Sequence, residues 1–170
     1  MDTRLRPTRP EDHVYVTRLE RDPANREHIG QWQDAEHLEA IARERGREHW
    51  IIERDGRPAG YLIAFDGTDR ATGIYVKRIL VADKERGTGT AALTAFLDQA
   101  FSRPGVDFVW LMVRDANLRA QSVYAKLGFR RYDPRDSEAA RLDETVDPAG
   151  AGVFRMRLEA SAYSRRSRAR

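Results

Sequence analysis

Apolar and polar residues alternate along this chain with two different periods, which mark the expected strands and helices. Short apolar runs predict strands at residues 3–6, 49–53, 59–65, 73–81, 106–113, 129–132 and 153–158. Apolar residues at helical spacing predict four helices: one after Pro10, one over residues 34–45, one after the glycines at 87 and 89, and one over residues 118–128.

The two N-terminal helices are each expected to bury one face. The first carries Val14, Arg18 and Leu19 at helical spacing, with acidic residues in its first turn. The corresponding face of the second helix consists of Leu38, Ile41 and Ala42. We expect both faces to pack against the rest of the fold.

The order of these elements predicts the topology of a sheet. Asp55-Gly56 suits a two-residue hairpin turn, because both residues tolerate positive φ angles. The strand at 74–81, the helix behind the glycines and the strand at 106–113 form a β-α-β unit, which requires a parallel crossover. The nearly continuous apolar run at 106–113 is typical of a strand buried in the middle of a sheet. The sequence therefore predicts an α/β (mixed α+β) fold around one mixed sheet.

Length and composition fit one domain. The chain has 170 residues, of which 41% are hydrophobic and 34% charged, and it contains no repeat or interior linker. We expect a single domain over residues 1–160 and a mobile basic tail over residues 161–170. Such a tail can bind nucleic acid, but no aromatic platform for bases accompanies it beyond Tyr163, so nucleic acid is not the expected partner.

The cysteine and histidine content excludes several classes of chemistry. Without cysteine there is no disulfide framework, no thiolate metal site and no covalent acyl-cysteine intermediate. The 4 histidines show no ligand spacing such as H-x-x-x-H, so no metal is expected. No apolar run reaches the ~18 residues of a membrane span, and the first residues lead into no secretory signal. The expected location is the cytoplasm, with no membrane partner.

The segment after the strand at 74–81 combines glycines with the start of a helix. In Lys84-Glu85-Arg86-Gly87-Thr88-Gly89, free backbone N–H groups meet the positive end of a helix dipole. Such a point binds anions, and side chains at positions 87 and 89 would hold phosphate oxygens away from the backbone. The pattern indicates a pyrophosphate site, and its plain alternative is a helix start that happens to contain glycine.

A second segment extends this signal. Residues at the spacing V-x-x-x-N-x-x-A-x-x-x-Y-x-K-x-G-F are Val113, Asn117, Ala120, Tyr124, Lys126, Gly128 and Phe129. Together with Q/R-x-x-G-x-G/A, which is met at Gly87 and Gly89, this order resembles the GNAT superfamily of N-acetyltransferases. Lys84 stands where that family usually has Gln or Arg, and a shifted register from Arg86 to Ala91 also fits. The two segments and the residues between them cover about a third of the chain.

The resemblance implies a fold and a cosubstrate. The implied fold is a central, mostly antiparallel sheet of about six or seven strands with helices on both faces. The implied cosubstrate is acetyl-CoA, with its pyrophosphate on the glycine turn and its pantetheine arm along the strand backbone. The implied cofactor-binding residues are Ile79, Leu80, Val81, Lys84, Arg86, Gly87, Thr88, Gly89, Thr90, Asn117 and Lys126. Asn117 can equally act as the N-cap of the helix that follows it.

Tyr124 matches the family tyrosine whose hydroxyl reaches the cofactor sulfur. A phenol with a pKa of ~10 stays protonated at neutral pH and can protonate a departing thiolate. The other interpretation is core packing, because Tyr124 shares an apolar stripe with Ala120, Val123 and Leu127. The resemblance thus implies direct transfer of an acetyl group to a primary amine in a ternary complex, with Tyr124 as the general acid.

The acceptor side is less defined. The expected partner is a small-molecule or peptide amine, and a homodimer is a further interpretation. The pocket that binds the acceptor amine is expected between the first two helices and the loop before the last strand, with a lining of Asn25, Ile29, Trp32 and Tyr75. Trp32 can equally be a core anchor. Candidates for the base that removes the amine proton are Glu20, Glu53 and His37, which the sequence does not rank.

Two other functions fit parts of the sequence. The run Gly87-x-Gly89-x-x-Ala92 also satisfies the dinucleotide-binding pattern of oxidoreductases, although the preceding strand carries Lys77 and Arg78 where such a strand is usually apolar. The second alternative is a non-catalytic acetyl-CoA sensor or interaction module. A phosphate-binding NTPase loop is excluded, because no Lys-Ser or Lys-Thr follows the glycines.

Overall fold

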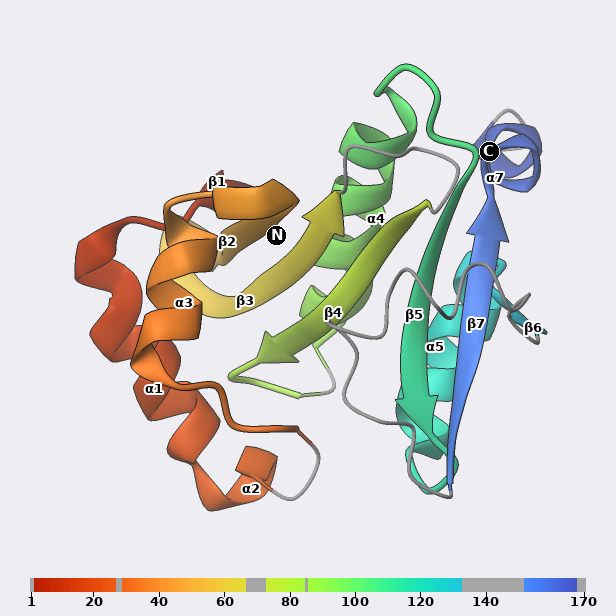
Figure 1. The fold of residues 1–170 in the computed structure, drawn as a ribbon. Helices are drawn as coiled ribbons and strands as arrows, with labels where there is room; N and C mark the ends of the chain where they lie inside the picture. The colour runs from red at the N-terminus through yellow and green to blue at the C-terminus, as the bar shows by residue number, and fades with distance from the viewer. Residues whose placement is uncertain (1, 27–28, 67–72, 85, 133–151, 168–170) are drawn as a thin grey trace.

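One sheet of 7 strands, in the order β1-β2-β3-β4-β5-β7-β6, organises the fold (Figure 1). The computed structural model describes residues 2–26, 29–66, 73–84, 86–132 and 152–167. The strands are β1 (Thr3–Pro7), β2 (Arg47–Arg54), β3 (Arg57–Asp66), β4 (Ile74–Val81), β5 (Phe108–Arg114), β6 (Arg130–Tyr132) and β7 (Val153–Glu159). The α-helices are α1 (His13–Arg21), α2 (Pro23–Arg26), α3 (Asp34–Ile41), α4 (Thr88–Phe101), α5 (Leu118–Leu127) and α7 (Ala160–Ser167), and 3-10 turns lie at Pro10–Asp12 and Glu44–Gly46.

The strand pairing confirms the predicted mixed, mostly antiparallel sheet. Among the described strands, β4 and β5 form the one parallel pair, and α4 makes the crossover between them. The β2–β3 hairpin turns at Asp55 and Gly56, whose φ angles are 50° and 76°, as the Asp-Gly sequence predicts. β5 lies between β4 and β7, and Val109 and Trp110 are completely buried there. Its continuous apolar sequence therefore reflects a central position.

Helices cover both faces of the sheet, as expected. Figure 1 shows α1 and α3 on one side of β2 and β3, with α4 and α5 on the other side of the sheet. Val16 and Leu19 of α1 pack on Ile63 and other apolar residues of the first face. On the opposite face, α4 supplies Leu93 and Phe96 to the larger core, which α5 and the strands complete.

The inward faces of α1 and α3 differ from those predicted. Val14 is 64% exposed and Leu38 is 48% exposed, although both belong to the predicted apolar faces. Leu19 is buried as predicted, and the other buried positions are Val16 and Glu20 in α1, and His37 and Ala40 in α3. Glu20 and His37 face other buried polar groups, so polar residues occupy inward positions where hydrophobic periodicity expects apolar ones. α3 also ends earlier than predicted, at Ile41.

The C-terminal residues form helix α7, where the sequence predicts a mobile tail from residue 161. The Tyr163 hydroxyl donates to Asp98 Oδ1 of α4 at 2.7 Å, and the Tyr163 ring centroid lies 5.2 Å from that of Phe101. An aromatic side chain with an apolar partner thus ties α7 to α4. The last residues of the expected tail, 168–170, lie outside the described residues.

Gly60 of β3 permits a close approach to β4. A Cβ atom at this position would lie 2.2 Å from the backbone carbonyl oxygen of Leu80. We predict that Gly60→Ala lowers the free energy of unfolding by about 1–3 kcal/mol, because two paired strands must move apart. Urea denaturation measures this loss. Gly89→Ala is the matched control, since its Cβ would meet only Val81 Cγ1, at 3.8 Å. Equal stability of both variants would contradict the prediction.

Candidate active site

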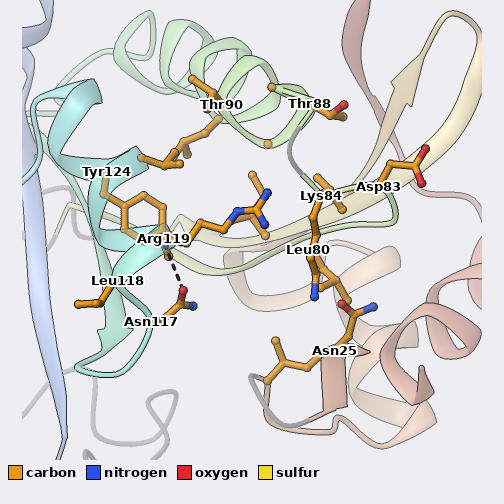
Figure 2. Close-up of a pocket in the computed structure, with 18 of the residues that line it drawn as sticks. Asn25, Leu80, Asp83, Lys84, Thr88, Thr90, Asn117, Leu118, Arg119 and Tyr124 are labelled. Carbon is orange, nitrogen blue, oxygen red and sulfur yellow. Dashed lines mark hydrogen bonds between the residues drawn. The ribbon is translucent and has the colours of Figure 1, made fainter. Parts of the chain in front are cut away.

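A cavity of about 590 Å³ lies where β4, α4 and α5 meet the segment after α1 (Figure 2). It brings together residues from three parts of the chain that are distant in sequence. Its lining consists of Asn25, Ile29, Ile79, Leu80, Val81, Asp83, Lys84, Gly87, Thr88, Gly89, Thr90, Leu93, Ala116, Asn117, Leu118, Arg119, Ala120, Val123 and Tyr124.

The N-terminus of α4 forms one wall of this cavity. The N-cap residue, Gly87, has a φ of 73°, a left-handed conformation that favours glycine. The N–H of Ala91 donates to the Gly87 carbonyl at 3.0 Å, which is the first hydrogen bond within the helix. The N–H groups of residues 88–90 therefore have no carbonyl acceptor within the helix. These groups and the helix dipole place partial positive charge at the cavity wall. The wall is suited to an anion.

Nothing in the fold requires a glycine at position 89. It lies in the first turn of α4 with no positive φ, and an added Cβ would make only an ordinary contact with Val81. Alanine would stabilise a helix at such a position by up to ~1 kcal/mol relative to glycine. Because Gly89 also lines the cavity, the missing side chain leaves room for a ligand to reach the helix backbone.

Gly89→Ala separates these two effects. We expect the free protein to be as stable as the wild type or more stable, while the Kd for CoA rises. Gly89→Val should raise that Kd by more than ~10-fold, since a branched side chain fills the approach to the N–H groups. Calorimetric titration with CoA measures the change. Ala91→Val is the control, because Ala91 is exposed in the same helical turn and lies outside the lining. Unchanged affinity in a folded Gly89→Val protein would remove the assignment.

β4 forms the second wall through its backbone. Its pairing with β5 covers only Ile74–Val76, and the strands diverge beyond that point. The Ala82 N–H donates to Ala59 of β3 at 2.9 Å. Because successive residues of a strand direct their N–H and C=O groups to opposite sides, Ile79 and Val81 direct theirs away from β3, toward the gap. An extended, amide-containing ligand can pair with this edge.

A bulge in β4 sets which side chains face the gap. Ile63 of β3 pairs with Arg78 and Ala64 pairs with Val76, so Lys77 is the extra residue. Val76 packs in the core beneath α4, whereas Leu80 packs against α1. Without the bulge, Val76 and Leu80 would point to the same face of the sheet; with it, they point to opposite faces. This change occurs where β4 and β5 separate.

The start of α5 forms the third wall. Asn117 is the N-cap of α5, and its Oδ1 accepts the Ala120 N–H at 3.1 Å (Figure 2). The capping interpretation of Asn117 is thus confirmed. Asn117 also lines the cavity. Its oxygen caps the helix, which leaves its side-chain NH₂ group to donate a hydrogen bond to a ligand.

Tyr124 lies both against the hydrophobic core and at the cavity, the two positions that the sequence suggests. Its ring packs against the main core, with its centroid 5.9 Å from that of Phe129, and it also lines the cavity. Burial raises the pKa of the Tyr124 hydroxyl to about 12, so the group is neutral and able to donate a proton at physiological pH. Within the described part of the chain, its hydroxyl has no hydrogen-bond partner.

Most of the predicted cofactor-binding residues line the cavity, and two do not. Arg86 is exposed and lies 3.8 Å from Asp83, and Lys126 is exposed on α5; neither belongs to the lining. Lys84 lies at the edge, where its Nζ donates to the Ala24 carbonyl at 2.8 Å. Arg119, a further cation, does line the cavity, and Figure 2 shows its side chain extending between Tyr124 and Lys84.

The predicted acceptor residues separate into two pairs. Asn25 and Ile29 line the cavity, whereas Trp32 and Tyr75 lie outside the lining. Tyr75 is only 3% exposed and stacks on Trp110, with ring centroids 4.1 Å apart. Trp32 packs edge-on against His37 at 5.3 Å, as expected for its alternative role as a core anchor.

The three candidate bases all have fixed partners. Glu20 is buried and binds Arg78 and Tyr61, and His37 Nε2 lies 3.2 Å from its second oxygen. Burial raises the pKa of Glu20, but the His37 hydrogen bond and the Arg78 charge outweigh it, so the net shift is downward. Glu53 lies on β2, where hydrogen bonds from Arg6 and Arg4 lower its pKa. Lowered pKa values make both carboxylates weak bases.

Neither a metal-binding cluster nor a membrane-spanning helix occurs among the described residues. They contain no group of three or more His, Cys, Asp or Glu side chains placed to hold a metal ion. No helix among them has the length and apolar composition to cross a membrane.

Solved structures of acetyltransferases share this fold. The aminoglycoside acetyltransferase AAC(6')-Ib in complex with coenzyme A is 20% identical, with a TM-score of 0.77 over 96% of this chain and 98% of that chain. Spermidine N-acetyltransferase from Vibrio cholerae, in complex with CoA and spermine, is 16% identical, with a TM-score of 0.73 over 95% and 98%. The ribosomal-protein-S18-alanine N-acetyltransferase from Escherichia coli is 20% identical, with a TM-score of 0.69 over 94% of each chain. No curated protein matches the sequence itself.

The dinucleotide-binding alternative is wrong. That fold is built on a parallel sheet, whereas β4–β5 is the one parallel pair among the described strands. The family model for the acetyltransferase (GNAT) family matches residues 13–129, which is more than half of the chain and includes both glycine turn and α5. The chain therefore belongs to the GNAT acetyltransferase family, and it is an acetyl-CoA-dependent N-acetyltransferase.

Proposed function

We propose that this enzyme transfers an acetyl group from acetyl-CoA to a primary amine by direct transfer in a ternary complex, with Tyr124 as the general acid. The observation that carries the proposal is the shared cavity. It joins an anion-binding helix N-terminus, a strand edge with free pairing groups and a protonated phenol. These are the features needed by a ligand with a pyrophosphate, an amide-containing arm and a thioester.

The described residues fit the binding of acetyl-CoA. The backbone N–H groups of residues 88–90 would hold the pyrophosphate, and Gly89 would let its oxygens approach the helix. Arg119 would add a cation on the opposite wall. The backbone of Ile79 and Val81 would pair with the amides of the pantetheine arm, and Asn117 would bind it through its side-chain amide.

Acetyl-CoA supplies a thioester, whose carbonyl carbon accepts the amine and whose sulfur leaves as a thiolate. Tyr124 would donate its hydroxyl proton to this sulfur as the C–S bond breaks. The nitrogen would lose its proton to water once the C–N bond has formed, and water would return a proton to the tyrosinate. A backbone N–H of β4 at the gap would stabilise the negative charge that develops on the carbonyl oxygen. The sequence has no cysteine, so no acyl-cysteine intermediate forms, and the amine would attack the thioester directly.

A panel of amines tests the transfer. Purified protein is incubated with acetyl-CoA and each amine, and free thiol is measured. The proposal predicts thiol release that depends on one class of amine and equals the acetylated product formed. Binding of acetyl-CoA with no amine-dependent release would favour the non-catalytic sensor instead. Spermidine, aminoglycosides and peptide N-termini belong in the panel, because structurally similar enzymes are named for such acceptors.

A further inference from the structure

The strands β5, β7 and β6 have a second face, on the side of the sheet away from α4 and α5. Figure 1 shows no described helix over this part of β5 and β7, whereas α1 and α3 cover β2 and β3. The strand register places Trp110 opposite Arg157, and both Met112 and Tyr132 opposite Arg155. Aromatic and arginine side chains therefore alternate across this face.

This face borders the point at which β4 and β5 separate. Tyr75 pairs with Trp110, and the pairing of the two strands ends one residue later, at Val76 and Leu111. Arg155 lies one strand further, about 4.8 Å away across the sheet from Met112. If acetyl-CoA enters from the α4 side, as the proposed function requires, the acceptor meets the thioester from this second face.

The groups that would bind a cationic acceptor on this face already contact arginine side chains. The Arg155 guanidinium lies 4.9 Å from the ring centroid of Trp110, and that of Arg157 lies 4.6 Å from Phe108 and 5.2 Å from Tyr132. Cations bind such ring faces, so a second cation would be repelled. Two carboxylates among the described residues of this side are also paired, Glu20 with Arg78 and Glu159 with Arg157.

Arg155 carries a donor that lacks an acceptor. Its Nη1 atom is buried, and it has no hydrogen-bond partner among the described residues. A guanidinium presents five N–H donors and always carries its charge, so leaving a buried nitrogen without an acceptor is costly. The Arg155 side chain as a whole is only half-buried, so its other nitrogens remain accessible to a ligand. The fork of a guanidinium matches a carboxylate, which can accept two parallel hydrogen bonds.

We infer that the acceptor amine carries an anionic group, a carboxylate or a phosphate, which binds Arg155 while the amine reaches the gap between β4 and β5. The acceptor class is then an amino acid, an acidic peptide or an aminophosphate rather than a polyamine or an aminoglycoside. This inference rests on the proposed function, because it assigns the substrate class of the same reaction.

Matched acceptors test the inference. L-lysine and 1,5-diaminopentane differ only by a carboxylate, and phosphoethanolamine and ethanolamine differ only by a phosphate. Thiol release from acetyl-CoA should show a kcat/KM at least about 10-fold higher for the anionic member of one pair. The pair that shows the preference identifies the anion. Equal or higher kcat/KM for the member without the anionic group, in both pairs, would overturn the inference.

Variants locate the preference at Arg155. In Arg155→Gln the ratio within the pair should fall to near one through a higher KM for the anionic amine, and Arg155→Lys should restore part of it. Arg131→Gln is the matched control, since its guanidinium lies 4.2 Å from the Phe154 ring, on the opposite face of the same hairpin. An unchanged ratio in a folded Arg155→Gln protein would contradict the inference.

Binding without turnover separates this inference from the proposed function. Calorimetry in the presence of CoA measures the affinity for each acceptor pair directly. Tighter binding of the anionic member, lost in Arg155→Gln, would support the anion site even if no thiol were released, and that result would contradict only the transfer. Equal affinity for both members would overturn the anion site even in an active enzyme.

Discussion

Replacing Tyr124 with phenylalanine is expected to lower turnover by about 10²–10⁴-fold, the range typical for the loss of a general acid. The ring stays in the apolar stripe of α5 and keeps its contact with Phe129, so the variant removes only the proton donor. CoA affinity should remain unchanged, because the α4 N-terminus and the β4 backbone are untouched. Steady-state thiol release gives the turnover, and calorimetry gives the affinity.

Tyr163→Phe provides the control for this substitution. It removes a hydroxyl that binds Asp98 on α4, outside the cavity, and it should leave turnover unchanged. A folded Tyr124→Phe enzyme with wild-type kcat, under conditions in which acetyl transfer limits the rate, would end the general-acid role. Tyr124 would then be a packing residue alone.

Replacing Arg78 with methionine is expected to lower the free energy of unfolding by about 3–5 kcal/mol, because it leaves the buried Glu20 carboxylate without its cation. Both side chains are almost completely inaccessible to solvent. The control is Arg4→Met, which breaks a 2.7 Å ion pair with Glu53 but removes a side chain that is 63% exposed. An exposed pair of this kind contributes only about 0–1 kcal/mol. Equal losses in the two variants would contradict the role assigned to Arg78.

The same pair gives a pH dependence with a definite sign. The folded-state pKa of Glu20 lies below its ordinary value of 4.5, where burial is outweighed by the His37 hydrogen bond and the Arg78 charge. The stabilisation is therefore present above pH 4.5 and is lost as the pH falls through the folded pKa. In Arg78→Met the cation is gone and burial dominates, so we expect acid to relieve the destabilisation. Denaturation midpoints measured from pH 7 to pH 4 test the change of sign.

The part of the fold that holds the cosubstrate could be predicted because its signals are local. The left-handed φ of Gly87 and the capping hydrogen bond of Asn117 each depend on a few neighbouring residues. The β4–α4–β5 crossover follows from element order alone. For the same reason most residues around these two turns line the cavity. Arg86 and Lys126 do not, because a motif gives their place in the chain and not the direction of a long side chain.

The inward faces of α1 and α3 could not be predicted, because they depend on partners far away in the chain. Glu20 is buried by Arg78, which lies 58 positions later, and by Tyr61, which lies 41 positions later. Periodicity treats a glutamate as exposed, so it placed Val14 on the inward face of α1 together with Leu19, and only Leu19 is buried. The bulge at Lys77 and the unpaired donor of Arg155 are likewise products of strand register.

A crystal structure of the CoA complex would give the distance between the CoA sulfur and the Tyr124 hydroxyl oxygen, and with it the role of Tyr124. We expect the pyrophosphate at the N–H groups of residues 88–90, the pantetheine arm along Ile79–Val81, and the sulfur within about 3.5 Å of that hydroxyl. A pyrophosphate bound away from the α4 N-terminus, or a sulfur beyond hydrogen-bonding reach of Tyr124, would contradict this expectation.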